Sequence, residues 1–372
     1  MGIRENVLAI LQGVRPSHIP WTIYKVLLPR SDTERSVRNA GLGLVSSVAI
    51  CHSRCPHVEV EERWLQGDTP ILQRDYHTPV GSVSERLRTD FSALNEGYQS
   101  QWVVEYMVKS VHDYDVVRFM IGDAVYEPDY TGFLQTQERM GQDGVLMASM
   151  GRCPLQRLSI EFAGVERLAY DLHDYPGVVE GLLGVMEERQ REVYHLAADS
   201  PAELIWSPDN ISSSRTSARW FERYILPFYN RQAPLLHERG KLYVAHMDGP
   251  LRGLKDLIAR CDLDVIEAFT LPPMGDLPIE EAQATWPGKT IWCNFPESLF
   301  FEGHAAVLDQ TLDLLRMTYE GGHFLLGLTE DMPESCWREG LLAMAEAVQR
   351  YQQEVGPWTI DNASWRQSST SL

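Results

Sequence analysis

Short apolar runs rich in β-branched residues recur along the chain, and segments with helical spacing of apolar residues separate most of them. The runs are continuous rather than alternating, which is typical of strands that are buried on both faces of a parallel sheet. Strands that alternate with helices indicate an α/β architecture. The predicted strands cover residues 19–24, 116–121, 144–149, 202–207, 241–246, 263–268, 289–294 and 323–328.

The segments between these runs carry the signals of helices. Before the fifth predicted strand, Ser217 has the side chain of an N-cap and Gly240 stops the helix. Before the last strand, Leu308, Leu312 and Leu315 form an apolar stripe. Eight strand–helix units predict a closed (β/α)8 TIM barrel, although the count alone is also compatible with a doubly wound open sheet.

The connection between the first two predicted strands is much longer than the others. It contains a predicted hairpin with Pro79 and Gly81 in its turn. Loops of this length are usually functional, so we expect this one to cover the site. The predicted organisation is one barrel domain over residues 1–358, with residues 27–115 as an insertion or lid, followed by a polar C-terminal tail over residues 359–372.

Composition narrows the class of partner. With 33 basic and 52 acidic residues the formal net charge is −19, which argues against nucleic acid and anionic membranes and leaves a small molecule or a basic protein surface. No stretch approaches the roughly 20 apolar residues of a membrane span, and the first residues lack a signal-peptide cleavage site. The six cysteines are scattered, which predicts reduced thiols and a cytoplasmic location.

Polar residues at the ends of the predicted strands are the candidates for chemistry, because barrel active sites lie at the carboxyl ends. His246 and Asp248 are two apart on an extended backbone and would converge. Glu267 and Glu330 come from other strand ends and could complete an oxygen-rich metal site. The alternatives are a hydrogen-bonded core histidine and structural ion pairs of the glutamates, for instance with Arg152.

A second group of strand-end residues could bind a flat substrate. Those aromatic rings that face the mouth of the barrel could stack on it, whereas the others would only fill the core. Arg152 could hold a substrate carboxylate in a bidentate manner, or pair with a carboxylate of the protein itself. The candidates are Trp21, Tyr24, Arg152, Trp206, Asn210 and Phe295. The sequence has no phosphate-binding glycine loop and no nucleophile elbow.

Several segments, in this order, resemble the uroporphyrinogen-decarboxylase superfamily. They run from about residue 3 to about residue 348 and include RPSHIPWTIYKVLLPR, RNAGLGLV, YHTPVGSVSE, SPAELIWSPDNI, KLYVAHMDGPLRGLKDLI, DVIEAFTLPPMGDLPIEEA, WCNFPES and LLGLTEDMP. The superfamily contains the decarboxylase itself and a branch of cobalamin-dependent methyltransferases. The resemblance implies a barrel enzyme of one of these two kinds.

The chain departs from both kinds at the residues that matter most. The decarboxylase has an arginine-rich motif that binds the acidic side chains of its substrate, whereas the matching stretch here offers Lys25 and Arg30 without paired arginines. Thiol-directed methyltransferases resemble this chain at His246, but Asp248 stands in place of their first zinc-binding cysteine and Glu330 lies close to the place of the second. Carboxylates in place of thiolates favour a bound oxygen, such as an ether or phenolate.

The resemblance is therefore greatest to the methyltransferase components of O-demethylase systems, which act on methoxylated aromatics such as vanillate. It implies that a methyl group passes from an aryl methyl ether to the cob(I)alamin of a separate corrinoid protein. His246, Glu267 and Glu330 would be the catalytic residues, and zinc would be bound by these three with Asp248. A decarboxylase that uses general acid catalysis and a non-catalytic ligand-binding barrel are the alternatives, and a homodimer is compatible with the sequence.

Overall fold

The computed structural model describes residues 1–67, 69–91, 100–319 and 322–355, so the predicted tail at 359–372 lies outside the described residues. Eight parallel strands close into a barrel in the order β1, β14, β13, β12, β11, β10, β9 and β2, which confirms the predicted α/β barrel. The strands are β1 (Trp21–Tyr24), β2 (Leu42–Val48), β9 (Gly144–Ser149), β10 (Leu204–Ser207), β11 (Leu242–His246), β12 (Val265–Thr270), β13 (Thr290–Asn294) and β14 (Phe324–Leu328).

One predicted strand is wrong. Residues 116–121 lie in helix α3 (Asp113–Gly122) and not in the barrel. Tyr114, Val117 and Ile121 are buried at the spacing of one helix face. A run of six apolar residues is too short for its pattern to distinguish a buried strand from a buried helix. In the structure this run is helical, and its buried residues lie on one face of the helix.

The true second strand is β2, which pairs with β1 and with β9. Its sequence, LGLVSSV, has glycine and serine among the apolar positions, so its hydrophobic signal is weak. Because β2 belongs to the barrel, residues 27–115 are not one insertion. The long excursion follows β2 instead, and it occupies residues 49–130 before helix α4 packs on β2 and β9.

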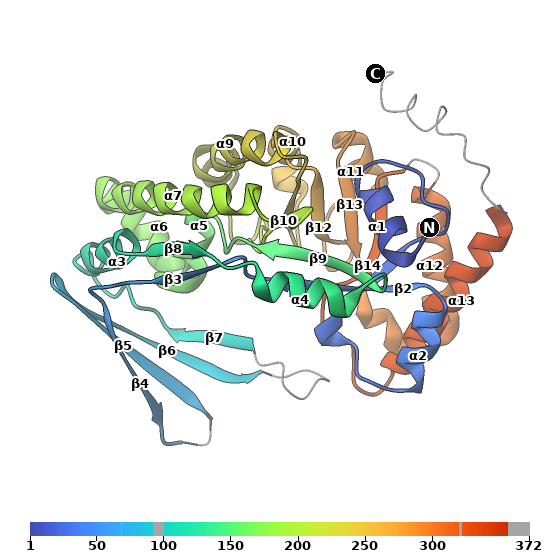
Figure 1. The fold of residues 1–372 in the computed structure, drawn as a ribbon, viewed down its shortest axis with the longest axis horizontal. Helices are drawn as coiled ribbons and strands as arrows, with labels where there is room; N and C mark the ends of the chain where they lie inside the picture. Colours follow the sequence, from blue (N-terminus) through green and yellow to red (C-terminus); the bar gives the residue numbers. More distant parts are fainter. Residues whose placement is uncertain (68, 92–99, 320–321, 356–372) are drawn as a thin grey trace.

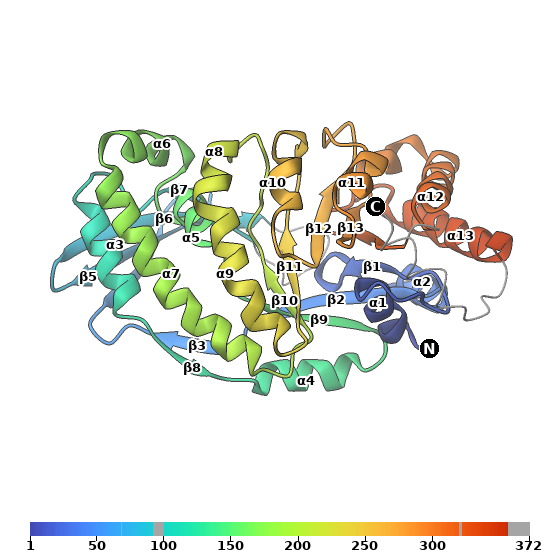
Figure 2. The same cartoon turned by 90° about the horizontal axis from the view of Figure 1, so that it is seen from above.

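Helices surround the barrel on its outside, and α7 and α9 run side by side along one flank in Figure 2. The α-helices are α1 (Ile3–Leu11), α2 (Asp32–Asn39), α3, α4 (Thr131–Met140), α5 (Pro154–Arg157), α6 (Val165–Asp174), α7 (Pro176–Ala198), α8 (Ala218–Trp220), α9 (Leu226–His237), α10 (Lys255–Ala259), α11 (Ile279–Thr285), α12 (His304–Thr318) and α13 (Trp337–Val355). Shorter turns are η1 (Lys25–Leu27), η2 (Leu158–Phe162), η3 (Phe221–Ile225), η4 (Arg252–Leu254) and η5 (Glu297–Glu302).

The predicted N-cap is confirmed, since Ser217 accepts a hydrogen bond from the backbone of Trp220. No helix in the described ranges combines the length and apolar character that crossing a membrane requires.

Helix α1 closes the amino-terminal end of the barrel. Its residues Val7, Ile10 and Leu11 belong to the apolar cluster that fills the barrel interior. The strands contribute Val45, Val145, Met147, Leu204, Val244, Val265, Trp292 and Leu325 to this cluster. With one end filled by packed side chains, the carboxyl ends of the strands are the end that remains for a site.

The excursion after β2 forms two small antiparallel sheets. β3 (Cys51–Arg54) pairs with β8 (Val125–Pro128), and β4 (Glu59–Leu65), β5 (Ile71–Thr78), β6 (Gly81–Phe91) and β7 (Ser100–Glu105) form a four-stranded sheet. The predicted hairpin is confirmed as β5 and β6. In Figure 1 the four-stranded sheet stands at the lower left, on the side of the barrel where α3 and α6 lie. Val83 of β6 is buried with residues of α3, so this sheet is anchored to the body.

The pairing of β2 with β9 can be tested at Gly144. A Cβ atom at this position would lie 1.8 Å from the backbone oxygen of Leu44, and backbone cannot move aside cheaply. We expect Gly144→Ala to reduce the free energy of unfolding by about 3 kcal/mol or more in urea titrations. Gly184→Ala is the control, because no atom lies within 4 Å of its Cβ position on α7, and it should stabilise the protein by about 0.5–1 kcal/mol. A Gly144→Ala protein as stable as the wild type would refute the pairing.

Candidate functional site

Three candidate residues converge at the carboxyl ends of the strands. His246 ends β11, Asp248 follows it, and Glu330 comes two residues after β14. One ligand atom from each side chain lies within 4.8 Å of those from the other two. His246 is buried, Asp248 is half-buried and Glu330 reaches the surface, so the group opens towards solvent on one side. We refer to these three residues as the His–Asp–Glu centre.

Glu267 lies behind this centre and is completely buried. Its Oε2 accepts hydrogen bonds from Nδ1 of His246 at 2.7 Å and from the indole N–H of Trp206 at 3.0 Å. Its Oε1 accepts from the hydroxyl of Tyr24 at 2.5 Å. A carboxylate that holds the proton on Nδ1 fixes the ring orientation and leaves Nε2 as the basic nitrogen. Glu267 therefore orients His246 and lies outside the His–Asp–Glu centre, which the other three predicted ligands form.

An irregularity in β12 accompanies the position of Glu267. Glu267 pairs with His246 of β11 in regular register, but the pairing with β13 shifts between Glu267 and Phe269. The intervening Ala268 has φ 62°, a left-handed conformation that costs an L-residue about 1–2 kcal/mol. Bulges of this kind redirect side chains and recur beside active sites. Here the bulge interrupts the regular pairing directly after the residue that binds His246, and the pairing with β13 resumes at Phe269.

The charges around His246 have opposing effects on its protonation. Burial alone would lower the pKa of His246, but Glu267 raises it, with smaller contributions from Asp248 and Glu330, and the result is a pKa of about 9 against an ordinary 6.5. Desolvation raises the pKa of Glu330, His246 lowers it, and Asp248 and Glu267 raise it further. The protonated imidazole stabilises the fold below pH 6.5, and this stabilisation is lost as the pH rises through about 9.

The donor atoms of the centre fit a divalent cation. Oδ1 of Asp248 is buried and has no hydrogen-bond partner in the described part of the chain, an arrangement that is costly unless a cation or proton is bound. One imidazole nitrogen and two carboxylates are ligands that Zn²⁺ and harder divalent ions accept. The hydrogen bond from His246 to Glu267 is the usual support of a metal-binding histidine.

Glu297 is a further buried carboxyl near the centre that the sequence did not single out. Burial raises its pKa to about 8, and Glu330 adds to this effect. Asn294 donates to its Oε2 at 3.3 Å and also accepts from the backbone N–H of Thr329 at 2.8 Å. In the sequence, the only signal for a functional Glu297 is its position shortly after a strand, which it shares with Glu330. Many carboxylates with a purely structural role have the same position. The two hydrogen bonds of Asn294 connect the ends of β13 and β14 beside the centre.

Of the aromatic candidates, Tyr24 and Trp206 reach the site. Their rings lie 6.4 Å apart, and the ring of Trp206 lies 6.1 Å from that of His246, both pairs edge-on. Trp21 does not reach the site, because alternation along β1 directs it into the core between barrel and helices, where it is completely buried. Phe295 is likewise completely buried, against Phe300. The expectation that Trp21 and Phe295 contact substrate is therefore corrected: both are core residues.

Arg152 and Asn210 follow β9 and β10 and line a cavity of about 680 Å³. The opposite wall comes from the four-stranded sheet, with Arg74 and Tyr76 of β5 and Glu85 of β6. The hairpin thus lies at the carboxyl-terminal end of the barrel. We call this space the sheet cavity.

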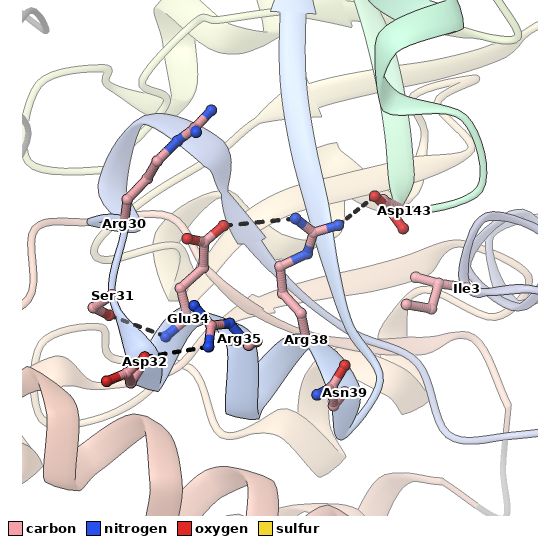
Figure 3. Close-up of a pocket in the computed structure, with 9 residues that line it drawn as sticks. All are labelled: Ile3, Arg30, Ser31, Asp32, Glu34, Arg35, Arg38, Asn39 and Asp143. Carbon is pink, nitrogen blue, oxygen red and sulfur yellow. Dashed lines mark hydrogen bonds and ion pairs between the residues drawn. The ribbon is translucent and has the colours of Figure 1, made fainter.

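A second hollow, of about 640 Å³, lies along α2 and the residues just before it and also contacts Asp143, just before β9 (Figure 3). Its charged side chains are mostly paired with one another: Arg38 contacts Glu34 and Asp143, and Arg35 contacts Asp32. None of its residues follows the carboxyl end of a barrel strand directly. The hollow is therefore separate from the His–Asp–Glu centre.

Comparison with known proteins identifies the fold. The sequence matches no protein-family model, and no curated protein matches it. Among solved structures, a methyltransferase from Methanosarcina mazei is similar over 94% of this chain and 99% of that chain, with a TM-score of 0.57 and 12% sequence identity. A GH18 chitinase, ChiB, from Flavobacterium johnsoniae covers 62% of this chain and 83% of its own, with a TM-score of only 0.35 and 10% identity. At such identities the likeness to the methyltransferase shows a shared barrel fold.

The role of Glu267 can be tested through the protonation of His246. In metal-free protein, Glu267→Gln removes the charge that raises the pKa of His246, so this pKa should fall from about 9 while burial continues to lower it. Tyr24→Phe is the matched control, because it removes one hydrogen bond to Glu267 and keeps the charge. Titration of the histidine ring signals by NMR measures both. An unchanged His246 midpoint in Glu267→Gln would contradict the assigned pairing.

Proposed function

We propose that this protein is a methyltransferase that removes the methyl group of an aryl methyl ether and transfers it to the cob(I)alamin of a separate corrinoid protein. The observation that carries the proposal is the His–Asp–Glu centre at the open end of the barrel, with Glu267 behind it. Support also comes from the sequence resemblance and from the barrel shared with a methyltransferase along nearly the whole chain.

The difficult part of this reaction is the departure of the aryl oxygen. As the bond between the methyl carbon and this oxygen breaks, the electron pair of the bond stays on the oxygen, so a phenolate leaves and must be stabilised. A divalent ion on His246, Asp248 and Glu330 would supply Lewis-acid stabilisation of that oxygen. Zinc is the ion that the resemblance suggests.

The residues around the centre contribute in definite ways. Glu267 keeps the proton on Nδ1 of His246, and Tyr24 and Trp206 hold Glu267 in place through their hydrogen bonds. Desolvation raises the pKa of Glu330, which is the direction that a general acid requires, so in the absence of an ion we propose this carboxyl as the proton donor to the departing phenolate. The rings of Tyr24 and Trp206 stand beside the centre and offer apolar surface to the flat ring of a substrate.

The geometry of methyl transfer requires the corrinoid acceptor to approach the substrate from outside the barrel. In-line displacement requires the attacking atom, the methyl carbon and the leaving oxygen to be nearly collinear. Helix α1 fills the amino-terminal end, so the acceptor must approach from the carboxyl-terminal end. We therefore expect the corrinoid protein to dock transiently on the face that carries Glu330.

The reaction itself is the first test. Purified protein, a reduced corrinoid protein and methoxybenzenes with different ring substituents should yield the free phenol and a methylated corrinoid. His246→Asn should lower the rate by about 100-fold or more. His304→Asn is the control, because His304 forms a similar pair with Glu346 at 2.8 Å on the protein surface, and it should keep full activity. Release of carbon dioxide from a benzoate instead of transfer would favour the decarboxylase alternative.

The metal is tested separately by elemental analysis. Protein purified without chelators should contain about one equivalent of a divalent metal, and Asp248→Ala should lose most of it, because a three-ligand site loses a charged ligand. His304→Asn should retain it. An active wild-type protein free of metal would refute the metal-bound form of the centre.

A further inference from the structure

Strand β4 is an exposed edge of the four-stranded sheet. It pairs with β5 on one side, and no strand in the described part of the chain pairs with its other side. Figure 1 shows β4 at the outer side of this sheet, away from the barrel. Residues 59–64 are all exposed, and Leu65 is half-buried. The outer edge of β4 therefore presents a row of backbone N–H and C=O groups that can accept a further strand.

The side chains of β4 do not protect this edge in the usual way. Proteins commonly protect an exposed edge with proline, with a bulge or with charged side chains, lysine above all. β4 has no proline and no lysine, and it pairs with β5 in regular register along its whole length. Its charges are of both signs, and the apolar side chains of Val60 and Trp64 are exposed to 51% and 61%. Apolar side chains of this size on an unpaired edge favour the addition of another strand.

A second copy of β4 is complementary to the first in one register. When a two-fold axis relates two antiparallel strands, opposite residues share a face of the joined sheet and the axis passes through one residue. With the axis at Glu62, every residue of the strand is paired. Val60 then lies opposite Trp64 of the second copy, and Glu61 lies opposite Arg63 of the second copy. Because the contact is symmetric, each of these pairs forms twice.

The pairs in this register stabilise antiparallel strands. An aromatic residue opposite a β-branched residue is favourable, and so are opposite charges. Glu62 meets its own counterpart on the axis, which is a contact of like charges. On each copy, however, Arg74 of β5 pairs with Glu62 at 2.6 Å and offsets this repulsion. The remaining pair, Glu59 with Leu65, lies at the ends of the two strands.

The neighbouring symmetric registers are less favourable. An axis at Glu61 retains one type of opposite-charge pair, but it places Val60 against Glu62. An axis at Arg63 places that arginine against its own counterpart and Trp64 against Glu62. Like charges directly opposite each other destabilise paired strands, and a charge beside an apolar side chain loses solvation. The sequence of β4 therefore specifies one register for pairing with itself.

We propose that β4 joins two copies of this protein in a symmetric dimer, in which the two four-stranded sheets form one continuous sheet of eight strands. The proposal does not depend on the proposed function. Val60 lies opposite Tyr76 of β5 and Glu62 lies opposite Arg74, so these residues share one face of the sheet. Arg74 and Tyr76 line the sheet cavity. The dimer therefore extends the sheet that forms the wall of this cavity and covers apolar side chains on the same face.

The dimer should be weak and reversible. One pair of short strands buries less surface than the interfaces of permanent dimers. The net charge of −19 on each copy also opposes association. We therefore expect a dissociation constant on the order of 1–100 µM.

Charge reversal in β4 tests the dimer by sedimentation velocity at protein concentrations above and below this value. The wild type should change from monomer to dimer as its concentration rises. Glu61→Arg places arginines opposite each other in two pairs and should raise the dissociation constant about 10-fold or more. Within one chain the new arginine lies opposite Asp75 of β5, so the sheet itself is not weakened. Glu61→Arg combined with Arg63→Glu exchanges the two charges and should restore the dimer.

Glu138→Arg is the matched control, because Glu138 is exposed on α4 and its reversal makes the same change in net charge. It should dimerise as the wild type does. A wild type that is monomeric at every concentration, or a dimer that Glu61→Arg leaves unchanged, would overturn the proposal. If the wild type stays monomeric and an added corrinoid protein protects the amides of β4 from hydrogen exchange, the edge belongs to that partner and the proposal fails.

Disulfide formation tests the position of the axis. In Glu62→Cys the two thiols meet on the axis, where the Cα atoms of opposite residues are about 4.5–5.5 Å apart, a distance that a disulfide spans. In Glu59→Cys the two thiols are roughly 20 Å apart along the paired strands, and this variant also controls for the native cysteines. Mild oxidation should yield a covalent dimer from Glu62→Cys alone. Crosslinking of Glu62→Cys that does not exceed that of Glu59→Cys would refute the pairing.

Discussion

A single buried carboxylate holds the site together. Glu267 is completely enclosed, and an ionised carboxylate in such a place is tolerated only when hydrogen-bond donors surround it. Its donors are Tyr24 from β1, Trp206 from β10 and His246 from β11, so four barrel strands meet at one side chain. The position of His246, and hence of any group bound to it, follows from this requirement.

The fold explains why this requirement can be met only at one end of the barrel. Helix α1 fills the amino-terminal end with apolar side chains, which leaves no polar surroundings for a carboxylate. At the other end, strands of unequal length and the bulge at Ala268 leave space for polar side chains. The excursion after β2 then encloses part of that end with the four-stranded sheet, which creates a cavity with walls from two distant parts of the sequence.

Most of the fold could be predicted from the sequence, and the errors have identifiable causes. Four consecutive apolar residues occur in β9 and three in β14, whereas in β2 Gly43, Ser46 and Ser47 interrupt the apolar positions, so that strand was hidden. The convergence of His246 and Asp248 followed from strand alternation. The position of Glu267 behind the centre did not, because it depends on the donors from three other strands that meet its carboxylate, and no single strand pattern gives that arrangement. Likewise, no pattern along β1 tells which face of the strand carries Trp21.

The excursion after β2 also provides residues for the sheet cavity that lie far along the sequence from those of the His–Asp–Glu centre. The His–Asp–Glu centre takes its side chains from β11 and from the end of β14, whereas the wall of the sheet cavity comes from β5, β6 and the segments after β9 and β10. Substitutions in the hairpin can alter the shape and charge of that wall and leave every hydrogen bond of Glu267 intact. The residues of the centre and those of the cavity wall are therefore encoded in different stretches of the gene, so the wall can vary in sequence without a change in the residues of the centre.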